Sequence, residues 1–379
     1  MIRIGITGQH GFIGTALSGR VLLLPDEFTL VPLSREQMSH PEDLARWAGS
    51  CDAIVHLAAV NRAADDATLH EANLKLCEQL AAAVRTAGSA PHIVFVSSTQ
   101  EARANAYGRS KVEGRQLLAA MADDVGATFT GMIIPNVFGP FGRPHYNSVV
   151  ATFCHQLCRG ETPRVDNDAK LNLIHVDEVV TAILDAIRTR LPATALPLAA
   201  TAVRGVAEIL QQLQGFVSGY LQEGRFPTLS TAFDLNLFNT FRSYIDHGAL
   251  FPRALTSHRD ARGAFTELVR TATGGQVSFS STFPGVTRGN HLHTRKVERF
   301  IVIFGSARIQ LRRHRSDEVL EFHLDGATPS YVDMPVWYTH NITNVGDTEL
   351  LTIFWINEAF DAADPDTFMD PVCVPAPID

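Results

Sequence analysis

The stretch Ile4-Gly5-Ile6-Thr7-Gly8-Gln9-His10-Gly11-Phe12-Ile13-Gly14 decides the fold of the first part of this 379-residue chain. The apolar residues before Gly8 predict a short buried strand, and those after Gly11 predict a helix. Glycines placed between a strand and a helix let the backbone turn tightly and approach a pyrophosphate with its N–H groups. The positive end of the helix points at the same anion. We therefore expect Gly8, Gly11, Phe12, Ile13 and Gly14 to bind a dinucleotide.

The residues that follow alternate between strand and helix patterns. Predicted strands span 28–33, 53–58, 93–97 and 130–135, and helical patterns at 69–87 and 110–121 lie between them. Continuous apolar strands separated by helices are typical of a parallel sheet covered on both faces. The first part of the chain is therefore predicted to be an α/β domain with a doubly wound parallel sheet of the Rossmann type.

The end of the second predicted strand indicates which dinucleotide is bound. An acidic residue at this point binds the ribose 2′-hydroxyl of NAD, whereas an arginine suits the 2′-phosphate of NADP. The strand ends in Leu33-Ser34-Arg35, and the first carboxylate is Glu36. We expect NADPH, with Ser34 and Arg35 on the 2′-phosphate.

A possible reaction centre follows the strand at 93–97. Ser97-Ser98-Thr99 ends this strand, and Tyr107-Gly108-Arg109-Ser110-Lys111 comes shortly after it. Tyr107 and Lys111 are one helical turn apart, so the ammonium lies beside the phenol. A nearby cation lowers the pKa of a tyrosine, which can then give a proton to a carbonyl oxygen as hydride arrives. Either Ser98 or Thr99 could hold that oxygen, and we favour Thr99.

Residues 1–245 resemble the extended, nucleotide-sugar-modifying branch of the short-chain dehydrogenase/reductase superfamily. Four pieces carry the resemblance: the glycine turn, His56-Leu57-Ala58-Ala59, the Tyr107/Lys111 pair and Pro135-Asn136-Val137-Phe138-Gly139-Pro140. The resemblance implies that Leu57, Ala58 and Ala59 lie along the cofactor. It also implies that Asn136 contacts a sugar nucleotide.

The pattern changes near Phe241. Helical periodicity stops, and short strands are predicted at 276–280, 299–303, 307–311 and 350–355. Closely spaced short strands are typical of an all-β sandwich or barrel. We expect a second domain over residues 246–379.

The second domain contains a set of residues suited to a metal. His291 and His293 are two apart on one predicted strand, so they share a face, Glu298 follows on the next strand, and His340 comes later. Three imidazoles and a carboxylate suit a divalent transition ion, zinc first, although iron, nickel or manganese could occupy the same set. Lys296, Tyr338 and His323 are candidate bases by chemistry alone.

The second domain resembles the cupin superfamily. The spacing of Gly285, His291, His293, Glu298 and Gly305 matches the first cupin motif, and Pro335, His340 and Asn344 match the second. Trp337 stands where the second motif usually has a glycine. A reductase followed by a cupin resembles one family, the bifunctional CapF-type enzymes of capsular polysaccharide synthesis.

The family resemblance implies a substrate and two reactions. The substrate would be a UDP-linked 2-acetamido-2,6-dideoxy-4-ketohexose on the route to UDP-N-acetyl-L-fucosamine. The cupin domain would epimerise C3, and the reductase domain would then reduce the C4 ketone with NADPH. The resemblance also suggests a homodimer.

Two other functions are compatible with parts of the pattern. One is a reductase acting on a dTDP-4-keto sugar with a metal-free cupin epimerase, but such cupins use a His–Asp base pair. The other is an NADPH-binding sensor or scaffold without turnover, but such sensors usually lack the Tyr/Lys pair.

Composition excludes several classes of protein. The formal charge is −8 and no Lys/Arg run occurs, so we expect neither nucleic acid nor a membrane surface as a partner. No apolar stretch of about 18 residues could span a bilayer. The five cysteines are scattered and odd in number, which is typical of a reducing cytoplasm.

Overall fold

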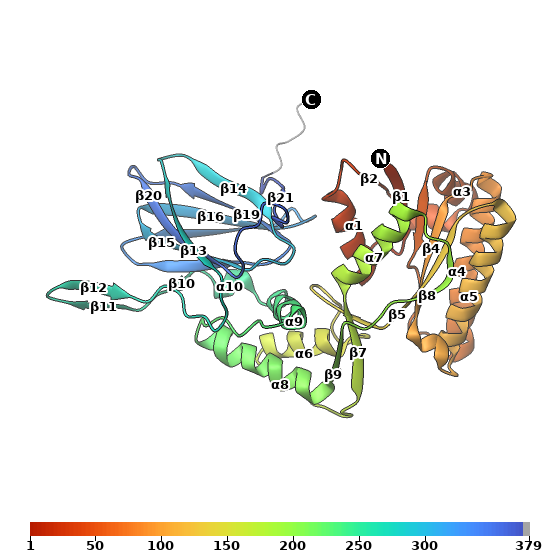
Figure 1. Cartoon of the computed structure of the whole chain (residues 1–379), viewed down its shortest axis with the longest axis horizontal. Helices are drawn as coiled ribbons and strands as arrows, with labels where there is room; N and C mark the ends of the chain where they lie inside the picture. The colour runs from red at the N-terminus through yellow and green to blue at the C-terminus, as the bar shows by residue number, and fades with distance from the viewer. Residues whose placement is uncertain (374–379) are drawn as a thin grey trace. The chain divides into compact units, whose positions relative to one another are not determined.

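The computed structural model describes residues 1–373 (Figure 1). These residues form two compact units. The first unit contains Met1–Arg143 and Asp168–Val206, and the second contains Pro144–Asn167 and the described residues from Ala207 onward. The boundary expected between residues 245 and 246 stays a prediction about where the two domains can be separated.

The first unit is built on a six-stranded sheet in the order β2-β1-β3-β4-β5-β8, in which every neighbouring pair is parallel. Its strands are β1 (Ile2–Thr7), β2 (Phe28–Val31), β3 (Ala53–His56), β4 (His92–Ser98), β5 (Phe129–Ile134) and β8 (Ala193–Pro197). The strand order reverses at β1, which lies between β2 and β3. Ligands of doubly wound sheets bind outside the carboxyl ends of the strands at such a switch point. The glycine turn that follows β1 is located there.

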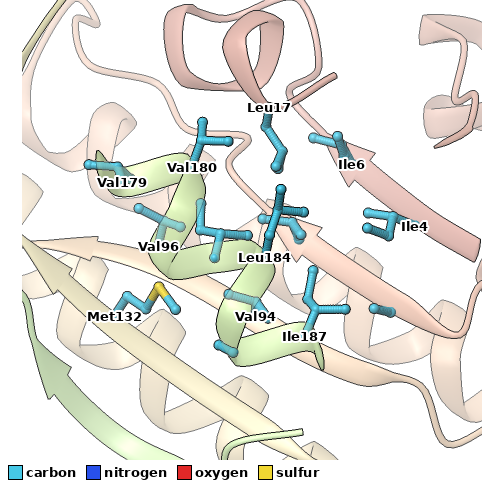
Figure 2. Packing of buried hydrophobic residues seen from close by; sticks show 14 of the residues in the cluster. Ile4, Ile6, Leu17, Val94, Val96, Met132, Val179, Val180, Leu184 and Ile187 are labelled. Carbon is cyan, nitrogen blue, oxygen red and sulfur yellow. The ribbon is translucent and has the colours of Figure 1, made fainter. Parts of the chain in front are cut away.

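Helices cover both faces of this sheet because its strands are apolar on both sides. α1 (Phe12–Leu22) and α7 (Val176–Thr189) pack on one face, where Leu17 and Leu184 meet Ile4 and Val94 (Figure 2). The other face is covered by α3 (Pro41–Gly49), α4 (Asp66–Ala87) and α5 (Ala106–Val125). Along β3, Ala53 and Val55 belong to the first core and Ile54 to the second.

Several shorter elements complete the first unit. They are α2 (Arg35–Ser39), the 3₁₀ helix η1 (Thr99–Ala102) and a small sheet of β6 (Asn136–Phe138), β7 (Lys170–His175) and β9 (Ala202–Gly205). β6 begins one residue after β5, so the small sheet starts at the carboxyl end of a strand of the large sheet.

The second unit combines two antiparallel five-stranded sheets. The first has the order β10-β18-β15-β20-β13, and the second has the order β17-β16-β19-β14-β21. The strands of the first are β10 (Arg253–Ala254), β13 (Gln276–Thr282), β15 (Glu298–Phe304), β18 (Ser330–Met334) and β20 (Leu350–Ile356). Those of the second are β14 (Thr287–Leu292), β16 (Ser306–Arg313), β17 (Val319–Asp325), β19 (Tyr338–Asn344) and β21 (Phe368–Met369). A hairpin of β11 (Ser257–Asp260) and β12 (Gly263–Thr266) stands apart from both sheets.

The helices of the second unit are α6 (Val149–Cys158), α8 (Val206–Phe216), the π-helical turn η2 (Val217–Gln222), α9 (Ala232–Arg242) and α10 (His247–Leu250). Two of them, η2 and α9, contact the first sheet, where Arg242 of α9 donates to the carbonyl of Met334 at 2.9 Å. A buried ion pair lies at this contact: Arg299 of β15 donates to both carboxylate oxygens of Asp333 at 2.7 and 2.9 Å. Tyr220 of η2 donates its hydroxyl to the same carboxylate at 2.8 Å.

The structure confirms the predicted fold class. A parallel α/β sheet comes first, and antiparallel β-sheets follow from residue 253 onward. Among residues 1–373, no helix combines the length and apolar character needed to cross a membrane.

Candidate active site and metal centre

The glycine turn after β1 can pack tightly against its neighbouring backbone only because its glycines have no side chains. Gly8 has φ +73°, and a Cβ on it would lie 2.8 Å from the backbone nitrogen of Ala58. A Cβ on Gly14 would lie 2.2 Å from the carbonyl oxygen of Gly8. Gly11 is the N-cap of α1 and has no side chain that could cap the helix. The N-terminus of α1, which begins with Phe12 and Ile13, therefore directly follows the glycine turn. This arrangement can accept an anion at the helix N-terminus.

The neighbouring strand end, Leu57-Ala58-Ala59, is fixed by polar contacts from behind. The hydroxyl of Thr7 accepts a hydrogen bond from the Ala58 N–H at 3.3 Å and contacts Nδ1 of His56 at 2.9 Å. Burial, together with the smaller influence of the Lys111 charge, lowers the pKa of His56 to about 3. His56 is therefore neutral at physiological pH and acts as a structural group.

Asn73 is a residue of this site that sequence reasoning missed. Its side chain accepts from the Val60 N–H at 2.6 Å and donates to the Val60 carbonyl at 2.9 Å. It also donates to the Ser110 hydroxyl at 3.3 Å, which connects the segment after β3 to α5. No local motif marks Asn73, because its partners are 13 and 37 residues away.

Ser34 and Arg35 lie beyond the end of β2, and both are exposed. Ser34 is the N-cap of α2: its hydroxyl accepts from the Gln37 N–H at 3.1 Å, and its own N–H donates to the Gln37 side chain at 2.9 Å. Gln9 of the glycine turn donates to the carbonyl of Leu33 at 2.7 Å. The glycine turn and the end of β2 are thus in direct contact.

Tyr107 and Lys111 lie in the first part of α5, as the spacing predicts. The ammonium of Lys111 is 5.7 Å from the centre of the Tyr107 ring and donates to the carbonyl of Val96 at 3.1 Å. Burial lowers the pKa of Lys111 to about 8, against the opposing influence of Cys77 and Glu101. Lys111 is therefore a cation near neutral pH and loses its charge at moderately alkaline pH.

The hydroxyl residues differ in their surroundings. The Ser98 side chain caps η1 by accepting from the Gln100 N–H at 3.2 Å, whereas Thr99 is exposed at the first residue of η1. A Cβ on Gly108 would lie 2.2 Å from the carbonyl oxygen of Gln100. The glycine after Tyr107 therefore lets η1 pack directly on the first turn of α5, which accommodates the short distance along the chain from Thr99 to Tyr107.

Glu101 fixes η1 from the other side. Its carboxylate accepts two hydrogen bonds from Arg115 at 2.9 and 2.8 Å and a third from the Ser97 hydroxyl. Burial alone would raise the pKa of Glu101, but Arg115 outweighs burial and lowers it. The ion pair between Glu101 and Arg115 was not predicted from the sequence. The available signal was that Arg115 lies one helical turn after Lys111, on the same side of α5.

Asn136, the expected substrate contact, lies at the start of β6 and is exposed. Its amide donates to the carbonyl of Asn172 in β7 at 3.2 Å. The contact orients the Asn136 side chain along the small sheet.

The four predicted metal ligands come together in the second unit. His291 lies in β14, His293 directly follows it, Glu298 begins β15 and His340 lies in β19. Their ligand atoms all lie within 4.8 Å of one another. Glu298 Oε2 is 3.1 Å from His293 Nε2 and 3.3 Å from His340 Nε2. Ligands about 2.1 Å from one tetrahedral ion would be roughly 3.4 Å apart, so the separations fit a single ion.

The tautomers of two histidines also fit a cation. Nδ1 of His293 lies 2.5 Å from the carbonyl of Asp366, and Nδ1 of His340 lies 3.2 Å from that of Tyr338. Because a carbonyl can only accept, both Nδ1 atoms carry the proton. Both Nε2 atoms then face the Glu298 carboxylate, and Nε2 of His340 is buried without a hydrogen-bond partner. A proton or a cation between these atoms removes the repulsion among them.

Burial sets much of the electrostatics at this cluster. Burial and, to a smaller extent, the neighbouring His340 and His293 lower the pKa of His291 to about 4. Burial opposes the ionised forms of Glu298 and His293, but their mutual contact lowers the pKa of Glu298 and raises that of His293. A neutral imidazole and an ionised carboxylate are the forms that bind metals.

Trp337, at the position where the second cupin motif usually has a glycine, adopts the left-handed backbone conformation that a glycine would favour. Its φ is +62°, and its side chain is buried. Its N–H donates to the carbonyl of His293 at 2.7 Å, and its own carbonyl accepts from the His314 N–H at 2.8 Å. The turn before His340 is therefore preserved, and it connects directly to the strand of the other two histidines.

The candidate bases have different environments. His323 is exposed and paired with Glu321 at 3.0 Å. The ammonium of Lys296 is buried and donates to the carbonyl of Pro365 at 2.8 Å. The ring of Tyr338 packs edge-on against His247, with the ring centres 5.4 Å apart.

Comparisons with known proteins agree with this two-part organisation. Residues 4–194 match the NAD dependent epimerase/dehydratase family, and residues 258–368 match the polysaccharide biosynthesis C-terminal domain. The chain is 34% identical over 371 residues to the UDP-2-acetamido-2,6-beta-L-arabino-hexul-4-ose reductase of Pseudomonas aeruginosa, covering 97% of this chain and 98% of that protein. It matches the crystal structure of the capsular polysaccharide assembling protein CapF from Staphylococcus aureus with a TM-score of 0.62 and 34% identity, covering 98% and 100% of the two chains.

The chain belongs to the CapF-type family. The second part also occurs in a smaller relative: the spore coat polysaccharide biosynthesis protein SpsL of Bacillus subtilis is 27% identical over 124 residues, which are 30% of this chain and 82% of SpsL. The family assignment therefore covers both units, and the parallel-sheet unit is of the NAD dependent epimerase/dehydratase type.

Proposed function

We propose that this chain performs two successive reactions on a UDP-2-acetamido-2,6-dideoxy-4-hexulose, as part of UDP-N-acetyl-L-fucosamine and capsular polysaccharide biosynthesis. The second domain, which we interpret as a cupin, epimerises C3, and the first domain reduces the C4 ketone. The observation that carries the proposal is the presence of two separate, assembled residue sets in one chain: Tyr107 with Lys111, and the His/Glu cluster. The full-length similarity to a UDP-hexulose reductase supports the choice of substrate.

The cofactor of the first domain is proposed to be NADPH, which supplies hydride when bound. At Gly8 and Gly14 a Cβ would collide with the backbone of Ala58 and Gly8, so these glycines keep the turn tight. The tight turn places the uncapped N-terminus of α1 where it can accept a pyrophosphate. Arg35 is exposed beside the turn and is the cation available for a 2′-phosphate, with Ser34 adjacent. Leu57, Ala58 and Ala59 lie along the same edge of the sheet.

Reduction of the ketone requires a proton at its oxygen. We assign this proton to the phenol of Tyr107, whose ionised form is stabilised by the Lys111 ammonium. Thr99 orients the carbonyl oxygen, because the hydroxyl of Ser98 already caps η1. Asn136 holds the sugar nucleotide. The buried position of Lys111 keeps its charge out of water and so strengthens its influence on Tyr107.

Epimerisation at C3 requires the hydrogen beside the ketone to become acidic. A divalent ion, zinc first, would be held by His291, His293, Glu298 and His340, and it supplies Lewis-acid polarisation of the C4 oxygen when bound. Asp366 and Tyr338 hold the Nδ1 protons of two of these histidines, so that Nε2 is left as the ligand atom. Because C3 inversion is reversible, reduction in the first domain draws the epimerised ketone forward.

We also propose a cytoplasmic homodimer. All five cysteines are free thiols, as a reducing compartment favours. β13 pairs only with β20 among the described strands, and its side chains Val277 and Phe279 are 65% and 76% exposed. Phe265 on the β11–β12 hairpin is 69% exposed. A second copy of the chain is the partner we expect for these apolar side chains, and light scattering in solution tests this.

The two-reaction proposal is tested by separating the reactions. Purified protein is given a defined UDP-4-keto sugar in deuterated water; NADPH oxidation is followed by absorbance, and deuterium at C3 by mass spectrometry. Tyr107→Phe is expected to abolish NADPH oxidation and leave C3 exchange intact. His293→Ala is expected to lose bound metal and C3 exchange.

Controls make each outcome decisive. NADH replaces NADPH in one arm, and a dTDP-4-keto sugar replaces the UDP sugar in another; both are expected to react poorly. Retained reduction by Tyr107→Phe would remove the role given to Tyr107. If elemental analysis of the wild-type protein finds no metal, the coordination proposal is wrong.

A further inference from the structure

A segment far from the metal ligands in sequence returns to the ligand cluster. We call Asp366–Val372 the strap. Within it β21 pairs with β14 so that Met369 lies opposite His291 and Phe368 opposite Leu292. The N–H of Asp370 donates to the carbonyl of Asn290 at 3.0 Å, which extends this pairing. The strap is therefore an added strand on the edge that carries two of the histidines.

Asp366, at the start of the strap, binds the whole turn between His293 and Glu298. Its carboxylate accepts from the N–H and hydroxyl of Thr294 at 3.1 and 2.7 Å. It also accepts from the N–H groups of Arg295 and Lys296 at 2.9 and 3.0 Å. Three consecutive backbone donors and one hydroxyl thus converge on one buried side chain, which is 5% exposed.

The main chain of the same residue orients a ligand. The Asp366 carbonyl accepts from Nδ1 of His293, and this contact aims Nε2 at Glu298. Asp366 has φ +42°, in the left-handed region that Asp adopts more readily than most residues. The carboxylate contacts therefore hold Asp366 in place, and Asp366 in turn orients His293 through its carbonyl.

The strap also reaches the strand of the third histidine. The carboxylate of Asp370 accepts from the hydroxyl of Thr339, the residue before His340, at 2.5 Å. Arg312 of β16 pairs with Asp370 at 3.0 Å and donates to the carbonyls of Pro371 and Val372 at 2.8 Å. The strap thus connects β14, β16 and β19 around the cluster.

We propose that Asp366 is a positioning residue of the metal centre and that ordering of the strap is thermodynamically coupled to metal binding. The proposal rests on the metal site proposed above. Partners that orient metal ligands typically affect metal affinity about 10–100-fold when they are mutated. Because coupling between two binding events is reciprocal, metal must stabilise the strap as much as the strap stabilises metal binding.

The variant Asp366→Asn tests the positioning role. Asn tolerates the same backbone conformation, but its side-chain N–H₂ group is a donor. It would face backbone N–H groups that now donate to the carboxylate, so at least one of these hydrogen bonds is lost. Zinc affinity is measured on the full-length protein by competition with a chelator, and Co²⁺ absorption reports the ligand geometry. We expect about 10–100-fold weaker zinc binding and an altered Co²⁺ spectrum. The matched control is Asp364→Asn, which removes only an exposed contact to Arg295 and should bind zinc normally.

Two further measurements keep the test decisive. Thr294→Val removes a single contact to Asp366 and should weaken zinc binding by less than Asp366→Asn. Hydrogen exchange on the wild-type protein needs no variant: the amides of residues 366–372 should exchange more slowly when zinc is added. Equal zinc affinity in Asp366→Asn and wild type, or strap exchange that is unchanged by zinc, would overturn the inference. A wild-type protein that binds no metal would instead refute the proposed metal site itself.

Discussion

The buried pair Arg299–Asp333 is expected to hold the helices of the second unit to the sheet that carries Glu298. Asp333 is fully buried, and Arg299 lies over the Tyr331 ring with its guanidinium carbon 3.6 Å from the ring centre. Replacing Asp333 by Leu keeps a similar volume but leaves the Arg299 charge buried without its partner. Removing one member of a buried ion pair costs about 3–5 kcal/mol of unfolding free energy.

The loss can be measured in two ways. Urea unfolding of the second unit is followed by tryptophan fluorescence, because Trp355 stacks on Phe226 at 4.3 Å close to the pair. For a domain of this size each kcal/mol lowers the melting temperature by about 2–4 °C, so a drop of roughly 6–20 °C is expected. The control Asp260→Asn breaks an exposed pair with Arg262 and should change stability by less than about 1 kcal/mol.

A double-mutant cycle identifies the cause. Arg299→Met combined with Asp333→Leu removes both charges, and the double variant should be more stable than Asp333→Leu alone. If Asp333→Leu costs as little as the surface control, or if the double variant is less stable than Asp333→Leu, the buried charge is not the source of the effect.

Two predictions concern the first unit. Gly14→Ala would place a Cβ 2.2 Å from the Gly8 carbonyl, so the turn must open, and we expect at least about 10-fold weaker NADPH binding by fluorescence titration. The control is Gly215→Ala, whose added Cβ meets nothing within 4 Å. Normal NADPH binding by Gly14→Ala would disprove the role of the turn. The pKa of Lys111 is lowered to about 8, so the cation beside Tyr107 is present below that pH and lost above it, and kcat/KM for reduction should fall as pH rises through about 8. Lys111→Arg should move this alkaline limb to higher pH, and an unmoved limb would assign it to another group.

Local patterns were sufficient for much of the fold. The glycine turn, the apolar runs at β3 and β4 and the change of pattern near Phe241 predicted a parallel α/β sheet followed by β-sheets, because burial on one or two faces imposes a period on the sequence. The sequence also predicted which four residues would form the His/Glu cluster, since two lie on one strand and motif spacing identified the others. It did not predict the sheet order, in which β1 lies between β2 and β3, because that order depends on contacts between distant strands.

The residues that hold the sites in place were not visible in the sequence. Asn73, Glu101 and Asp366 belong to no motif, and each acts through partners that are far away in the chain or on a different element. By itself the sequence determined which chemically active residue sets are present: a glycine turn, a Tyr/Lys pair and a His/Glu set. Only the tertiary structure decided which polar groups aim and support these residues. A hydrogen bond such as the one that orients His293 depends on where two atoms distant in sequence meet in space. Burial, which lowers the pKa of Lys111, is likewise a property of the packed chain rather than of any local stretch.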